Sequence, residues 1–299
     1  SNGLFVDGGD NVTILDNIFK VDLLSAPVTW VEEGGSYVSY PVSEGIVIKN
    51  SNGAIFKRNN VATIYHNVTG GEYNTIYVVD LAKSPNSEIS DNLIGGRGYS
   101  YIYGVIVTSE TFTIFNNTII VVADDYCSYA VNPDAGANGV VQNNTLVTIS
   151  KNVTYTVYSM MYGDNTAMDI DYIANKVYGR AYYVNVFDLG GEDENLINNT
   201  IIAEGNYTVA IISSSKNNTI SGNIIRSLGS SVGDMKVPYV YEYVTEAIKL
   251  QGAVAAISDN YIESAGDYAV DLSDSASTLE NNYIAAKKST GSSAVINAA

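Results

Sequence analysis

The chain has 299 residues, 46% of them hydrophobic, and is therefore long enough to bury a continuous core. Acidic side chains outnumber basic ones 32 to 15. The formal net charge of −17 argues against nucleic acid or an anionic membrane surface as a partner, because clustered Lys and Arg recognise both. The lone Cys127 excludes an intrachain disulfide, and no apolar run reaches the ~18 residues of a membrane-spanning helix.

One short phrase recurs along the chain: a β-branched strand, an asparagine, and a second β-branched strand. It is first read at 14–18, and clear copies follow at 89–93 and 114–118. Successive asparagines are 22 to 25 residues apart at the shortest, with longer steps where loops are inserted. Such a period indicates a solenoid built from one repeated unit. The asparagines are Asn17, Asn60, Asn92, Asn117, Asn144, Asn175, Asn199, Asn223, Asn260 and Asn282.

Each unit holds a second phrase, an aromatic residue two positions before a valine. Examples begin at Tyr129, Tyr182, Tyr207 and Tyr268. Together with the strands before and after the asparagine, this phrase gives each coil three short strands rich in Val, Ile, Thr and Tyr. We expect these tyrosines to form either a structural ladder along one sheet or a platform for sugars. No segment has a sustained period of 3.6 residues, so we expect almost no helix.

The sequence therefore predicts an all-β fold, a right-handed parallel β-helix of about ten three-strand coils that forms one domain over residues 1–299. Asparagine tolerates left-handed backbone angles at a tight corner, and amides stacked at the strand spacing of ~4.8 Å would hydrogen-bond in a ladder. A leucine-rich repeat would need leucines at fixed offsets and a helical return, and a propeller blade would need ~40 residues. Neither matches this chain.

Two larger insertions interrupt the coils, at about residues 22–43 and 229–245. Both follow a post-asparagine strand, so both should leave the solenoid at the same edge, seven coil steps or about 34 Å apart. Loops on a rigid scaffold commonly carry recognition, and exposed aromatic rings suit sugar faces or protein hot spots. The alternative is that these loops cover the sheet. The candidate ligand-binding residues are Trp30, Tyr37, Tyr40, Tyr239, Tyr241 and Tyr243.

No catalytic motif is evident. The best acidic candidates are the pair Asp124-Asp125 and the cluster formed by Asp188 and residues 192–194, and the only histidine, His66, precedes Asn67. We predict no catalytic residue, no metal site and no cofactor, with Ca²⁺ as the one candidate ion because the chain is so acidic. Outward charges in the aromatic slot indicate a solvated face of weak surface pairs. They are Asp7, Lys49, Asp80, Asp188, Lys249 and Asp271.

Eight Asn-x-Ser/Thr sequons occur, a pattern that suits a glycosylated surface protein, although the repeated asparagine phrase itself generates Asn-Asn-Thr. They begin at Asn11, Asn67, Asn116, Asn143, Asn152, Asn198, Asn206 and Asn217. Because the sequence opens and stops in mid-pattern, we expect it to be a segment of a larger protein. We expect that protein to lie outside the cell or on its surface.

The phrases Asn-Asn-Thr-Ile-Ile at 198–202 and Ser-Asp-Asn-Tyr-Ile at 258–262 resemble the pectin-lyase-like right-handed parallel β-helices, and more narrowly the adhesin-like surface proteins of methanogenic archaea. The resemblance extends from Gly3 to Ile296 and concerns residues that build the scaffold. It implies a non-catalytic adhesin-like module that presents a binding face to a glycan or a protein. Because one fold hosts many functions, two alternatives stay open: a polysaccharide lyase or hydrolase, and a structural spacer.

Overall fold

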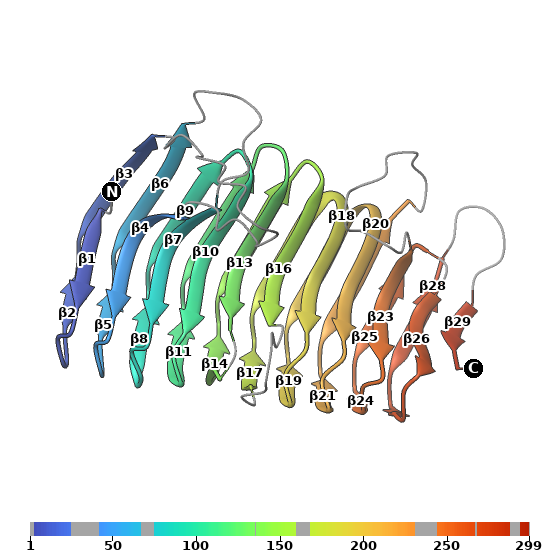
Figure 1. The fold of residues 1–299 in the computed structure, drawn as a ribbon. Helices are drawn as coiled ribbons and strands as arrows, with labels where there is room; N and C mark the ends of the chain where they lie inside the picture. The colour runs from blue at the N-terminus through green and yellow to red at the C-terminus, as the bar shows by residue number, and fades with distance from the viewer. Residues whose placement is uncertain are drawn as a thin grey trace, which may run out of the picture.

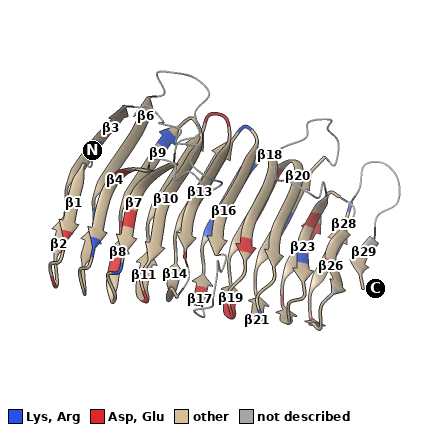
Figure 2. Cartoon of the chain, in the orientation of Figure 1, with Lys and Arg blue, Asp and Glu red and all other residues tan. Residues whose placement is uncertain are grey.

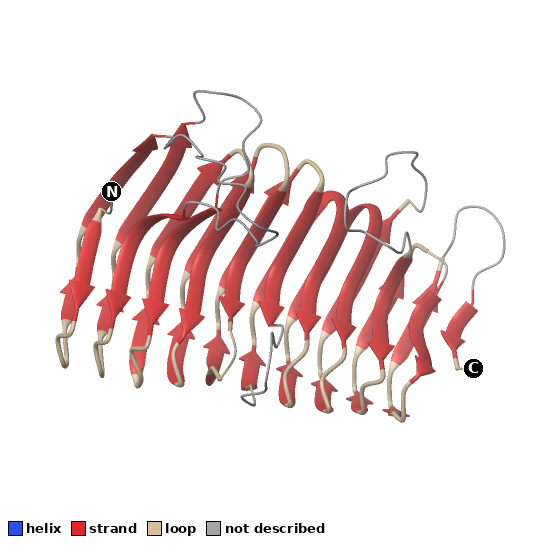
Figure 3. Ribbon diagram, in the orientation of Figure 1, coloured by secondary structure: helices blue, strands red, loops and turns tan. Residues whose placement is uncertain are grey.

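The computed structural model describes residues 3–24, 42–66, 75–134, 136–159, 168–230, 244–266, 268–287 and 294–298. Over these residues all regular structure is β-strand, with no helix (Figure 3). The strands are parallel and stack into a long rod, with the N-terminus at one end and the C-terminus at the other (Figure 1). The predicted parallel β-helix is confirmed.

Each coil contributes one strand to each of three faces, here called A, B and C in chain order. Face B is a ten-stranded parallel sheet, and faces A and C are joined in one 19-stranded sheet. The join arises because β18 (Lys176–Leu189) and β20 (Thr200–Ser213) each continue from face C into face A without a break. A coil therefore runs from A to B to C and then into the next coil.

The other strands of face A are β1 (Leu4–Asp7), β4 (Val42–Lys49), β7 (Thr75–Ala82), β10 (Tyr101–Thr108), β13 (Cys127–Pro133), β16 (Val153–Ser159), β23 (Thr245–Gln251), β26 (Tyr268–Asp274) and β29 (Ala294–Asn297). Face B holds β2 (Thr13–Leu15), β5 (Ile55–Lys57), β8 (Ser87–Ser90), β11 (Thr111–Phe115), β14 (Asn138–Gln142), β17 (Asp169–Ile173), β19 (Asp193–Ile197), β21 (Asn217–Ser221), β24 (Ala255–Ser258) and β27 (Thr278–Glu280). The other strands of face C are β3 (Ile18–Leu24), β6 (Asn60–His66), β9 (Leu93–Gly98), β12 (Thr118–Ala123), β15 (Thr145–Ser150), β22 (Ile224–Gly229), β25 (Tyr261–Ser264) and β28 (Tyr283–Ala286).

The core is a continuous apolar column inside the rod. Strand residues alternate between this interior and the outside, as in β6, where Val61 is buried and its neighbour Ala62 is exposed. Neighbouring coils place like side chains in register, so Ile89, Ile114 and Val141 follow one another through face B. A solenoid unit cannot bury its own apolar face alone, and stacking on the next unit completes the core.

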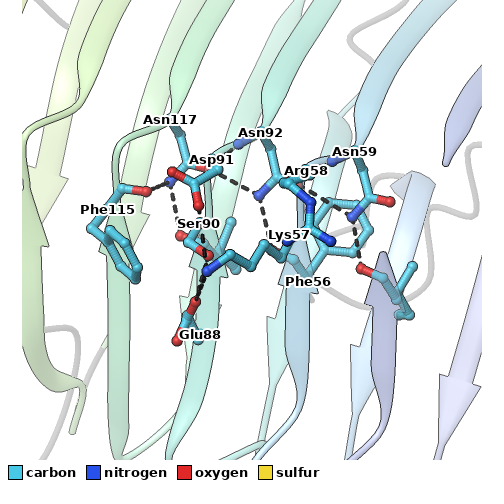
Figure 4. Close-up of polar contacts among 12 residues, drawn as sticks. Phe56, Lys57, Arg58, Asn59, Glu88, Ser90, Asp91, Asn92, Phe115 and Asn117 are labelled. Carbon is cyan, nitrogen blue, oxygen red and sulfur yellow. Dashed lines mark hydrogen bonds and ion pairs between the residues drawn. The ribbon is translucent and has the colours of Figure 1, made fainter. Parts of the chain in front are cut away.

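An asparagine ladder follows the corner between faces B and C (Figure 4). At Asn117, the side-chain Nδ2 donates to Oδ1 of Asn144 over 3.0 Å and to the carbonyl of Ile89 over 2.8 Å. The backbone N–H of Asn117 donates to the same Oδ1 over 2.8 Å. Polar groups that the tight corner buries are thereby satisfied, which is required of a buried amide.

The ladder consists of Asn17, Asn59, Asn92, Asn117, Asn144, Asn175, Asn199, Asn223, Asn260 and Asn282. The second position corrects the sequence reading, which placed Asn60 there. Asn60 instead begins β6 as an exposed residue in register with Ile18 and Leu93. Two adjacent asparagines made both registers possible from the sequence, and only one of them buries Val61.

The corner geometry also differs from expectation. The left-handed backbone angle belongs to the residue before each ladder asparagine, with φ of 56° at both Asn116 and Asn143. This turn position also accepts Ala174 at φ 54° and Gly222 at φ 68°. The ladder asparagine is therefore selected for its buried amide, and the residue before it for tolerance of the left-handed region.

Candidate functional site on face A

The six aromatic residues predicted to bind ligand, Trp30, Tyr37, Tyr40, Tyr239, Tyr241 and Tyr243, lie outside the described residues. The strands that flank the two insertions are placed as predicted. β3 ends at Leu24 on face C before β4 begins at Val42 on face A. β22 ends at Gly229 before β23 begins at Thr245, so the second interruption falls at the same edge between faces C and A.

Face A carries an outer layer of tyrosines that is separate from the core. Tyr126, Tyr129, Tyr183 and Tyr207 form a cluster with Cys127 and Val153, and further tyrosines pack against it. In the middle of the face, Tyr77, Tyr103 and Tyr129 follow one another in strict register on β7, β10 and β13. Alternation along each strand places these rings outside, while residues such as Ile76 and Ile102 point into the core.

The tyrosine rings stack mainly on one another. The rings of Tyr103 and Tyr129 are parallel within 1° at a centroid distance of 4.2 Å, and Tyr129 stacks on Tyr155 at 5.6 Å. Tyr158 meets both Tyr129 and Tyr155 edge to face. This is the structural ladder that the sequence allowed, and it leaves the ring edges and hydroxyl groups as the part that can meet a ligand.

A polar pocket of about 220 Å³ opens in this layer. It is smaller than the ~300–1,000 Å³ sites that enclose drug-sized ligands. Burial raises the pKa of Tyr77 above its usual value, which keeps this phenol neutral and able to donate a hydrogen bond. The lining residues are Tyr77, Tyr103, Ile106, Tyr129, Asn132, Asp134 and Tyr158.

A carboxyl pair lies beside one end of the pocket. Glu44 is the register neighbour of Tyr77, and Asp80 is the register neighbour of Ile106. Burial, the charge of Glu44 and a hydrogen bond to Glu44 raise the pKa of Asp80 to about 7. Asp80 therefore holds a proton well above the usual range of a carboxyl group.

A second carboxyl lies beyond the other end of the pocket. Asp188 is the register neighbour of Tyr158, and burial raises its pKa to about 7. Nδ2 of Asn185 approaches Asp188 at 3.4 Å, and Oδ1 of Asn185 is buried without a partner. Asp80 and Asp188 are four strand steps apart, or about 19 Å. A tyrosine surface with acidic groups at both ends therefore follows the rod axis.

The acidic candidates named from the sequence do not form a site. Asp124 pairs with Arg97 at 3.0 Å and Asp125 with Lys151 at 3.0 Å, all near the surface. The acidic residues around Glu194 do not form a cluster, because successive side chains of β19 point to opposite sides of the sheet. Asp193 is exposed, while Glu194 points into the rod. Asp188 belongs to face A, one turn earlier.

Glu194 is a buried carboxyl with a complete set of donors. The hydroxyl of Ser159 donates to Oε1, and Oε2 accepts from Ser215 Oγ at 2.6 Å and from the backbone N–H of Gly191 at 2.7 Å. Burial nevertheless raises its pKa to about 7. It is enclosed in the solenoid interior, so it is a structural group with no access to a ligand on face A.

The outward charges of face A form two columns, where the sequence analysis assumed one. Asp7 and Lys49 are register neighbours at a distance of 3.6 Å between the charged atoms. Asp80 instead opposes Val47, in the column that later holds Asp188, Lys249 and Asp271. The tyrosine phrases are also shifted relative to one another. Tyr183 and Tyr207 are in register with Cys127, which lies two residues before Tyr129 on the same strand. Loops of different length hid these shifts in the sequence.

Face C has larger hollows with less suitable chemistry. One of about 320 Å³ lies over β6, β9 and β12 and is lined almost entirely by aliphatic side chains and glycine, including Ile64, Gly95 and Ile120. Another of about 450 Å³ contains Arg180 and Glu204, which pair with each other at 3.7 Å. Most strand residues carry no charge (Figure 2). Face A is the better candidate because its pocket lies within the layer of stacked tyrosines, whose fixed rings and hydroxyl groups can orient a ligand.

No group of three or more His, Cys, Asp or Glu side chains suited to a metal ion occurs in the described part of the chain. Within the same ranges, no helix has the length and hydropathy to cross a bilayer. No protein-family model, curated protein or solved structure matches the chain.

Sequence reasoning missed the pocket for a specific reason. It identified the tyrosines of the aromatic phrase but not Asn132, Asp134 or the carboxyl pair. Glu44 and Asp80 are 36 residues apart in neighbouring coils, and the sequence alone does not show where the loop between the coils begins and ends. The available signal was that Glu44 occupies, in its coil, the slot that Tyr77 occupies in the next.

Proposed function

We propose that the chain is a non-catalytic, adhesin-like module of an extracellular surface protein, and that face A binds a glycan along the rod. The observation that carries this proposal is the polar pocket in the tyrosine layer, where the phenols of Tyr77, Tyr103, Tyr129 and Tyr158 meet Asn132. Fixed hydroxyl and amide groups on a rigid sheet are suited to hydroxyl-rich ligands, because little side-chain freedom is lost on binding.

The charges of face A narrow the ligand class. Asp134 lines the pocket, Glu44 and Asp80 flank one end, and Asp188 lies beyond the other. A polyuronate would bring its carboxylates against the carboxyl group of Asp134 in the pocket wall, and like charges at an interface are costly. The expected ligand is therefore a neutral sugar chain or one that carries amino groups, and a protein partner would present an uncharged or basic surface.

The carboxyl pair is the one feature that favours the alternative of a hydrolase. Its geometry argues against that use. A glycosidase holds its two carboxyl groups about 5 Å apart or more, so that the sugar bond or a water fits between them. Glu44 and Asp80 are hydrogen-bonded to each other. Two carboxyl groups that hydrogen-bond to each other are closer together than such a catalytic pair, which supports a binding role over a catalytic one.

The two aromatic insertions are also proposed to contribute to ligand binding. Their flanking strands end at the border between faces C and A, next to the tyrosine layer. Trp30 and Tyr239 are the residues of each insertion whose truncation would test a contribution to binding. A spacer with no ligand is the remaining alternative, and it predicts that no variant on face A alters binding to anything.

A glycan array of neutral, amino and uronic oligosaccharides, screened with the intact chain, tests the proposal. We expect binding to neutral or amino glycans, loss of that binding in Asn132→Ala, and retained binding in Thr219→Ala on face B. Incubation of each bound glycan with the protein should release no shorter product. No binding across the array would refute the glycan proposal, and cleavage that is lost in Asp80→Asn would replace it with a hydrolase.

A further inference from the structure

The corner between faces B and C carries exposed asparagines in a backbone turn that is the same from coil to coil. At each of the ten corners, the order is a left-handed turn residue, the ladder asparagine, and the first residue of the face C strand. The ladder asparagine is buried, with 1% of Asn117 exposed, whereas the turn residue Asn116 is exposed. The fold thus separates an Asn-Asn pair into an amide used by the scaffold and an amide that faces solvent.

The scaffold does not prescribe the other two positions of the corner. The turn position reads Asp, Arg, Asp, Asn, Asn, Ala, Asn, Gly, Asp and Asn from the first coil to the last. The first strand position reads Ile, Asn, Leu, Thr, Thr, Lys, Thr, Ile, Tyr and Tyr. Both positions face outwards and accept unlike side chains, so packing links neither residue to the other.

The two positions are nevertheless linked in this sequence. Threonine occurs at the first strand position in three coils, as Thr118, Thr145 and Thr200, and each of these coils has asparagine at the turn. The strands that precede them, at 111–115, 138–142 and 193–197, share no residue at the same position. Residues 116–120 and 198–202 both read Asn-Asn-Thr-Ile-Ile, whereas 143–147 reads Asn-Asn-Thr-Leu-Val, so the shared part of these coils is confined to the corner and the start of the next strand. Asparagine followed two positions later by threonine is the acceptor signal for N-linked glycans.

We propose that Asn116, Asn143 and Asn198 are N-glycan acceptor sites, which together form a glycosylated edge along the rod. Among the described residues no hydrogen bond engages their side-chain amides, and all three are exposed. This corner is the only one of the three that does not border face A, since a coil runs from A to B to C. Glycans on this edge would shield the rod while leaving the tyrosine pocket open.

Two of the other sequons differ in their geometry. Asn152 immediately precedes β16 and its Oδ1 is buried, and Asn217 donates its side-chain amide to Asp193 at 2.8 Å. Asn281 provides a natural control. It occupies the same turn at φ 55°, but Tyr283 stands where the acceptor signal needs threonine or serine.

Peptide mass spectrometry of the protein isolated from the cells that make it tests the proposal. Trypsin leaves residues 98–151 as one peptide, so chymotrypsin, which cleaves at Tyr126, is needed to separate Asn116 from Asn143. We expect sugar mass on Asn116, Asn143 and Asn198, and none on Asn281. Unmodified asparagines at all three corners would overturn the proposal.

Secretion from a host with N-glycosylation provides a second measurement. The variant Thr118→Val/Thr145→Val/Thr200→Val should lose the sugar at these corners, whereas the same positions changed to serine should keep it. Tyr283→Thr should add a glycan at Asn281. An equal glycan load in the valine variant and the parent chain would contradict the proposal. Binding at face A should be the same in all variants, so this test stands apart from that of the glycan-binding proposal.

Discussion

Asn117 and Asn144 are joined twice, because both the side-chain Nδ2 and the backbone N–H of Asn117 donate to Oδ1 of Asn144, over 3.0 and 2.8 Å. The relationship repeats between each ladder asparagine and the next, from Asn17 to Asn282. One carboxamide oxygen therefore fixes both the neighbouring side chain and the neighbouring backbone, and the coil register is determined at this corner.

Replacing an inner ladder residue should destabilise the fold. Asn199 donates to Asn223 and to the carbonyl of Tyr172, and its oxygen accepts from Asn175. Asn199→Leu leaves these buried groups without partners and should lower the free energy of unfolding by ~1–3 kcal/mol. Denaturant unfolding measures the effect. Asn17→Leu, at the exposed end of the ladder, is the control and should cost less; equal losses would contradict a buried ladder.

The turn before the ladder offers a stabilising substitution. Ala174 has φ 54°, a region that asparagine adopts more readily than alanine. Ala174→Asn should therefore raise the free energy of unfolding by about 0.5–1 kcal/mol. The same change at Ala256, an exposed position in β24, should be neutral or destabilising because asparagine disfavours strands. Thermal melting of both variants tests this, and a loss of stability in Ala174→Asn would count against the assigned turn.

The buried carboxyl groups predict a fall in stability from acid to neutral pH. Burial raises the pKa of Glu194 from 4.5 to about 7. Below about pH 4.5, Glu194 is protonated in both the folded and the unfolded chain. Between that pH and about 7, the unfolded chain releases a proton that the folded chain keeps, so the folded state loses up to about 3 kcal/mol relative to the unfolded state. Asp80 and Asp188, whose pKa values are also raised to about 7, act in the same direction.

Melting temperatures measured from pH 4 to pH 8 should therefore decrease in the parent chain. Glu194→Gln removes one titrating group and should flatten this decrease. Asp193→Asn, the exposed neighbour, should leave it unchanged. The same pH dependence in Glu194→Gln and in the parent chain would show that Glu194 does not hold its proton in the fold.

Ligand binding at face A should depend on individual hydroxyl groups. Tyr158→Phe removes one phenol from the pocket wall and should weaken binding of a glycan identified on the array by about 1 kcal/mol, or roughly fivefold. Tyr261→Phe makes the same chemical change on face C, where Tyr261 stacks on Tyr283, and should leave the affinity unchanged. Titration calorimetry compares the two, and an equal effect of both variants would locate the ligand elsewhere.

The charge preference of the pocket is testable with one substitution. Asp134 is the acidic residue of the lining. Asp134→Asn should raise the affinity for a uronic oligosaccharide relative to the matching neutral one, and the difference should shrink at high salt because ions screen exposed charges. An unchanged ratio at low salt would show that repulsion by Asp134 does not set the ligand class.

The sequence by itself determined the fold class, because one short sequence pattern recurs from coil to coil. The period of the asparagine phrase and the alternation of β-branched residues predicted parallel coils with three strands each, and both are present. Sequence reasoning also placed the two interruptions, expected at about 22–43 and 229–245, at one edge of the coil, and β3 and β22 end at that edge at Leu24 and Gly229. Each of these features depends on residues within a single coil, so a sequence pattern can reveal them.

The tertiary structure alone decided the register between coils and everything built on it. The choice of Asn59 over Asn60, the separation of Asp188 from Glu194, and the meeting of Glu44 with Asp80 all depend on where one coil lies upon another. Loops of unequal length precede many coils, and a shift of one or two residues moves a side chain to another face or column. Contact between coils fixes that shift through buried side chains and ladder amides, which is why the pocket on face A became visible only in three dimensions.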